Sequence, residues 1–172
     1  MSHPTHPATV HFPITTTLLA GGLDAVYFLS NNGPTSTIVG SAFKTLDIAI
    51  SPAMLPLLSY YATILTLLFS APAIATGAYE LMPVIQRDGF SSKKAKVGVM
   101  HALINDLGVV AAAYNWWTRR SNPGFMPTDT NILLSALVAL PATMWAAYLG
   151  GSLVYIHGMG LRGGQAKAKK RQ

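Results

Sequence analysis

Four long apolar segments dominate this sequence. They run from Phe12 to Leu29, from Met54 to Met82, from Val97 to Trp117 and from Asn131 to Ile156. A hydrocarbon core about 30 Å thick is crossed by roughly 20 apolar helical residues, so each segment is long enough to span a bilayer. Only 10% of the 172 residues are charged and 51% are hydrophobic, whereas soluble domains carry about 25% charged residues. The sequence therefore predicts an all-α integral membrane bundle of four transmembrane helices and argues against a soluble globule.

Polar and Pro/Gly-rich stretches at 30–40, 87–96 and 121–130 separate the four segments and are predicted to be loops. Within the segments, Pro56, Pro72 and Pro141 each remove a backbone donor, and we expect them to bend their helices. Residues 1–162 are thus expected to form the four-helix domain. Residues 163–172, rich in Lys, Arg, Gly and Gln, are predicted to be a disordered basic tail.

The distribution of basic residues predicts the orientation in the membrane. Four spans place both termini and the second loop on one side. That side carries nine basic residues and the other side three: Lys44, Arg119 and Arg120. The positive-inside rule then makes the termini cytoplasmic, or matrix-facing in an organelle. We interpret the basic tail as a contact for anionic lipid head groups, and we expect no nucleic-acid partner.

Ionisable and amide side chains at one end of the predicted bundle are the candidate functional residues. An ionisable group in hydrocarbon costs several kcal/mol unless it is paired or faces a cavity. Because the first and third helices begin where the second and fourth end, one polar layer is predicted at the end that bears the termini. Its members are His11, Glu80, His101, Asn105 and His157.

Three imidazoles and a carboxylate are ligand types of a haem or metal site, and the sequence has no cysteine that could supply a thiolate. The first interpretation is a haem b held by two of His11, His101 and His157, with Glu80 and Asn105 fixing the imidazoles. Such a chain would be an electron carrier or membrane oxidoreductase that exchanges electrons with a quinone or a redox partner protein.

Two other interpretations remain open. In the second, all three histidines and Glu80 bind non-haem Zn, Cu or Fe. In the third, the layer is interhelical hydrogen bonding within a cofactor-free accessory subunit of a larger complex or a homo-oligomer. Two further carboxylates, Asp24 and Asp106, are expected to form structural ion pairs or hydrogen bonds, with Arg119 or Arg120 as the partner of Asp24.

Four short motifs carry a family resemblance. They are His3-Pro4 and His6-Pro7 before Val10-His11-Phe12-Pro13-Ile14, then Gly77-Ala78-Tyr79-Glu80, then His101 with Asn105, and finally Gly150-Gly151-Ser152-Leu153-Val154-Tyr155-Ile156-His157-Gly158. In order and spacing they resemble the transmembrane family catalogued as domain of unknown function 2231. The resemblance implies a four-helix membrane protein without a settled activity. Glu80 stands where that family often has Asp, and Ser152 where it often has an acidic residue.

Overall fold

The computed structural model describes residues 5–159, and all regular structure in this range is helical. The predicted basic tail lies outside the described residues. In chain order the elements are α1 (His6–Thr9), α2 (His11–Asn31), α3 (Gly33–Thr45), the 3-10 turn η1 (Pro52–Met54), α4 (Leu55–Asp88), α5 (Lys93–Arg119), the 3-10 turn η2 (Pro123–Phe125), α6 (Asp129–Ile132), the π-helical segment η3 (Leu133–Ala139) and α7 (Leu140–Tyr155).

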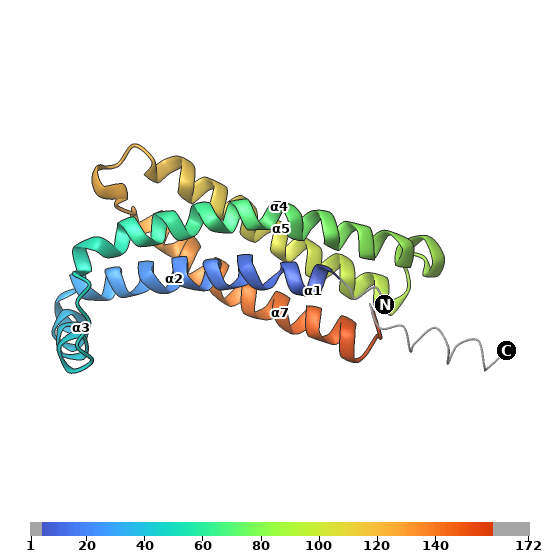
Figure 1. Cartoon of the computed structure of the whole chain (residues 1–172), viewed down its shortest axis with the longest axis horizontal. Helices are drawn as coiled ribbons and strands as arrows, with labels where there is room; N and C mark the ends of the chain where they lie inside the picture. The colour runs from blue at the N-terminus through green and yellow to red at the C-terminus, as the bar shows by residue number, and fades with distance from the viewer. Residues whose placement is uncertain (1–4, 160–172) are drawn as a thin grey trace.

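These elements build four rods that are long and apolar enough to cross a membrane, at His6–Asn31, Pro52–Asp88, Lys93–Arg119 and Pro123–Tyr155. Each rod contains one of the four predicted segments, apart from the last residue of the fourth. α2 packs against α4, α4 against α5, and α5 against α7, while α7 and η3 close back onto α2. α1 and the end of α7 lie toward one end of this bundle, where α4 turns into α5, and α3 lies at the other end, across the direction of the long helices (Figure 1).

Many side chains in the interior of the bundle are small and polar, whereas many on its outer surface are large and apolar. On α4 the inward positions Ser59, Thr63, Thr66 and Ser70 are all buried. Their spacing of four, three and four residues keeps them on one helix face. Leu68 and Leu107, in contrast, are 62% and 69% exposed. This arrangement suits hydrocarbon, where small interior residues let helices approach and large apolar side chains meet lipid.

The first predicted loop is wrong over most of its length, because α3 occupies Gly33–Thr45. Asn32 has extended backbone angles and Pro34 lies in the first turn of the helix. Proline is favoured at this position, since its fixed φ suits a helix and the first turn needs no backbone donor. A Gly-Pro pair that reads as a loop signal therefore begins a helix here.

The prolines of the spans act in different ways. Pro56 lies in the first turn of α4, where its missing donor has no consequence, and α4 continues as one helix through Pro72. Before Pro141 the fourth rod widens into the π-helical segment η3, in which the Leu140 N–H donates to the Ser135 carbonyl oxygen five residues earlier. This local change from the α-helical pattern places Ser135 in the buried interior of the bundle.

Candidate functional site

A pair of histidines, His6 and His101, lies between the helices, toward the end of the bundle where α1 is found. α1 brings His6 against α4, where the His6 Nδ1 is 3.0 Å from the Ala73 carbonyl oxygen. The His6 backbone N–H donates to the Glu80 carboxylate at 3.1 Å. Thr9 completes this contact, with its hydroxyl 3.0 Å from that of Thr76. The polar face of α1 is therefore bound to the end of α4.

The second histidine joins α5 to α7. The His101 Nδ1 is 2.8 Å from the Ala146 carbonyl oxygen. Asn105 donates from its amide to the His101 carbonyl oxygen at 2.7 Å, and the same amide nitrogen is 3.4 Å from the His101 Nε2. The ring centres of His6 and His101 are 6.1 Å apart and their planes are nearly perpendicular, at 88°. Four helical elements thus bring two imidazoles together.

Both imidazoles have a defined tautomer in this arrangement. A carbonyl oxygen only accepts hydrogen bonds, so Nδ1 of each ring carries the proton and Nε2 carries the lone pair, which in His101 lies 3.4 Å from the Asn105 amide nitrogen. A backbone carbonyl on Nδ1 is the usual support of a histidine that ligates a metal through Nε2. Each ring can therefore offer its Nε2 nitrogen as a ligand.

Two glycines make room for the two rings. A Cβ placed on Gly77 of α4 would lie 2.8 Å from Cε1 of His6, and one placed on Gly150 of α7 would lie 3.1 Å from Cε1 of His101. Both distances are shorter than ordinary van der Waals contact. Each glycine therefore lets an imidazole pack directly against a neighbouring helix backbone.

A second polar cluster lies toward the other end of the bundle. Asp24 of α2 and Arg119 of α5 form an ion pair at 3.1 Å, with both side chains fully buried. The remaining Arg119 donors reach the carbonyl oxygens of Pro56 at 2.9 Å and Phe125 at 3.0 Å. Hydroxyls of Ser59 on α4 and Ser135 on η3 donate to the Asp24 carboxylate. All four rods are joined through this one pair, which confirms the predicted pairing of Asp24.

An amide pair extends this cluster. The Asn131 side chain donates to the Asn115 side-chain oxygen at 2.9 Å, and the Asn115 amide donates to the Asn131 carbonyl oxygen at 3.2 Å. Asn131 also closes a capping box with Thr128 at the start of α6. Since a capped helix start and an interhelical bond share one residue, the fourth rod begins at a fixed position against α5.

The family model described as Predicted membrane protein (DUF2231) matches residues 2–163. That range includes both polar clusters and all four rods. The chain belongs to the DUF2231 family. It matches no curated protein and no solved structure.

Three of the five candidate residues of this DUF2231 chain lie at the histidine pair: Glu80, His101 and Asn105. His11 is exposed on the first turn of α2. His157 follows the end of α7, about two helical turns beyond the glycine that contacts His101. The predicted polar layer therefore forms only in part, without His11 and His157.

His6 lies at the site but was not among the predicted site residues. Its signal is the Pro7 that follows it, because Pro7 lies in the first turn of α1 and marks a helix start before the apolar run. His6, Thr9 and Thr16 are also spaced by three and seven residues, which places them on one helix face.

The structure also bears on the metal site, on Asp106 and on Ser152. Within residues 5–159 no three His, Cys, Asp or Glu side chains lie close enough together to hold a metal ion. Asp106, for which an internal partner was expected, is exposed on α5. Ser152, at a position where the family often has an acid, donates its hydroxyl to Leu149 of its own helix.

Proposed function

We propose that this membrane protein binds haem b between His6 and His101 and transfers electrons. The observation that carries the proposal is the ring pair, with centres 6.1 Å apart and each Nδ1 held by a backbone carbonyl. His6 and His101 would hold the haem through imidazole nitrogens, which are common ligands of haem iron. This choice replaces His11 and His157 with His6 as the partner of His101.

The residues around the pair suit a redox role. Haem would supply a centre that takes up and releases one electron. The Ala73 and Ala146 carbonyls would hold the ligand tautomers, and Glu80 would fix α1 through the His6 backbone. Partial burial of both rings among the helices would limit their contact with water and so tune the potential. A quinone or a redox partner protein would be the electron donor or acceptor.

We also infer that this end of the bundle faces the cytoplasm, or the matrix of an organelle. Arg87, Lys93, Lys94 and Lys96 flank the turn between α4 and α5, near the ends of the same helices that carry the histidine site. At the other end Arg119 is buried in its ion pair, which leaves Lys44 and Arg120 exposed. The bias of basic residues therefore favours the histidine end as the inner side.

The visible spectrum of the protein purified in mild detergent tests the proposal. We expect a Soret band that shifts on reduction with dithionite and that is lost in His6→Ala and in His101→Ala. The matched control is His11→Ala, which removes an exposed imidazole five residues from His6 and should leave the spectrum unchanged. His157→Ala should also leave it unchanged.

Other outcomes decide between the remaining interpretations. A band that is lost in His11→Ala or His157→Ala and kept in His6→Ala would overturn the ligand assignment. A colourless protein with stoichiometric zinc, copper or iron would favour the non-haem site. A colourless protein without metal, purified together with other subunits, would favour an accessory role.

A further inference from the structure

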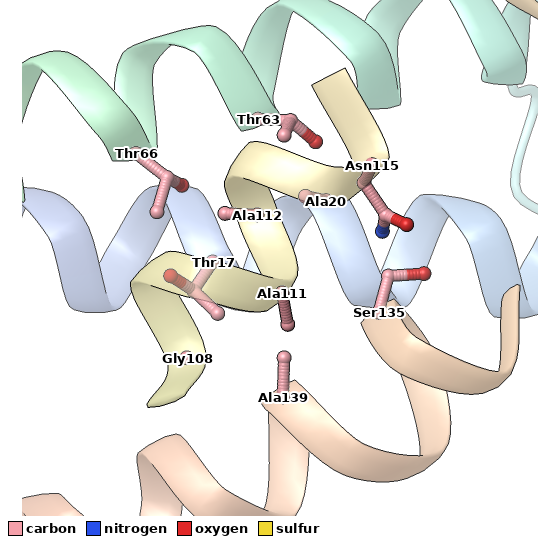
Figure 2. Close-up of a pocket in the computed structure, with 10 residues that line it drawn as sticks. All are labelled: Thr17, Ala20, Thr63, Thr66, Gly108, Ala111, Ala112, Asn115, Ser135 and Ala139. Carbon is pink, nitrogen blue, oxygen red and sulfur yellow. The ribbon is translucent and has the colours of Figure 1, made fainter. Parts of the chain in front are cut away.

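A small cavity lies where the four rods meet, apart from the histidine pair. It is lined by Thr17 and Ala20 of α2, by Thr63 and Thr66 of α4, by Gly108, Ala111, Ala112 and Asn115 of α5, and by Ser135 and Ala139 of η3 (Figure 2). The space open to the centre of a water molecule is about 20 Å³. A single water needs at least about 10–15 Å³ by this measure, so the cavity is large enough for one.

The lining offers hydrogen-bond acceptors that are not saturated. Each threonine hydroxyl has one hydrogen and two lone pairs. Thr63 uses its hydrogen on the Ser59 carbonyl oxygen at 3.0 Å, and the Thr66 hydroxyl lies 2.9 Å from that of Thr16. Both threonine oxygens therefore keep acceptor capacity inside the bundle.

The lining also offers a donor. The Asn115 amide has two hydrogens, and its contact with the Asn131 carbonyl oxygen uses one of them. Asn115 is only 2% exposed, so its second hydrogen cannot reach bulk solvent. A buried amide hydrogen without a partner is costly in the low-dielectric interior of a bundle.

The cavity also touches the ion-pair cluster. Ser135, which lines it, donates to the Asp24 carboxylate at 2.6 Å. On the side toward the histidines, Thr66 is bonded to Thr16. A molecule in the cavity that both donates and accepts would connect these two groups across the middle of the bundle.

We propose that the cavity is a binding site for one internal water molecule. This water accepts from the Asn115 amide and donates to threonine hydroxyl oxygens, which extends the Asp24 network by about one helical turn toward the histidine pair. It satisfies polar groups of α4 and α5 that the bilayer could not hydrate.

Water-edited solid-state NMR on the full chain in lipid bilayers tests the site directly. Ala20 and Ala139 line the cavity and are 6% and 7% exposed, whereas Ala73 is equally buried, at 7% exposure, and does not line it. We expect polarisation from water to reach the methyl groups of Ala20 and Ala139 at least several-fold faster than that of Ala73. Equal transfer to all three methyl groups would overturn the proposal.

A pair of glycine variants gives a second test that does not depend on assigning methyl signals. A Cβ on Gly108, which lines the cavity, and a Cβ on Gly151, which does not, would each meet no atom within 4 Å. Both alanines gain the same helix propensity. Gly108→Ala should displace the water and leave Asn115 without its partner, so its unfolding equilibrium constant should be at least fivefold larger than that of Gly151→Ala. If Gly108→Ala is as stable or more stable, the cavity is dry and the water site is wrong.

Discussion

The buried ion pair supports a quantitative prediction about stability. In Asp24→Ala the Arg119 guanidinium stays in the interior, fully buried, without its counter-charge. The hydroxyls of Ser59 and Ser135 lose a charged acceptor at the same time. Hydrogen bonds to a charged group contribute about 1.5–3 kcal/mol each, and breaking a buried pair by removing one partner costs about 3–5 kcal/mol. We expect the free energy of unfolding to fall by about 4 kcal/mol, within that range.

A double-mutant cycle tests the cause of this loss. Asp24→Leu combined with Arg119→Met removes both charges and fills the volume with apolar groups. Because no unpaired charge remains, the double variant should be more stable than either single variant, with a coupling energy of about 2 kcal/mol or more. The assay is reversible unfolding by SDS in mixed micelles, followed by tryptophan fluorescence or circular dichroism.

The chain provides matched controls for both halves of the pair. Asp106→Leu removes another carboxylate of an apolar segment, one that is exposed on α5. Arg120→Met removes the neighbouring guanidinium, which is exposed and stacks over the Trp117 ring at 3.3 Å from its centroid. Each should change stability by less than about 1 kcal/mol. Additive losses in the cycle, or a loss in Asp24→Ala no larger than in Asp106→Leu, would refute the reasoning.

Three further predictions concern single contacts. Gly77→Ala places a methyl 2.8 Å from Cε1 of His6, so it should lower stability by about 1–3 kcal/mol through overpacking and weaken any visible absorbance band; an unchanged melting midpoint would contradict this packing. Glu80→Ala removes the acceptor of the His6 backbone N–H and should cost about 1 kcal/mol, whereas Glu80→Gln keeps an acceptor oxygen and should cost less in the same SDS titration. Asn131→Ala loses both the capping box and the bond to Asn115 and should cost about 2 kcal/mol or more, and a loss below 0.5 kcal/mol would contradict the double role.

The four spans and the identity of one ion pair were predictable from the sequence. Segment length and hydropathy are local properties, and a bilayer of fixed thickness converts them directly into spans. Asp24 could be assigned to Arg119 or Arg120 because an up-and-down chain brings the end of the first segment to the end of the third. The choice of Arg119 depends on helix rotation, which turns this residue inward and leaves Arg120 on the surface.

The histidine pair was decided by the tertiary structure. His11 opens the first apolar segment, and the sequence therefore made it the candidate ligand of that helix. Only the packing of α1 against α4, through Glu80 and the space above Gly77, turns His6 toward His101. Which imidazoles meet is a property of the facing surfaces of several helices, and no single segment carries that information.

Segment length and apolarity were enough to specify four membrane-spanning helices, since a helix satisfies its backbone hydrogen bonds within one segment. Three features became visible only in the folded bundle: the helix at Gly33–Thr45, the π-helical segment η3 with Ser135 buried in it, and the position of His6 beside His101. These features arise where residues far apart in the chain compete for the same interior space, so they depend on contacts and not on composition.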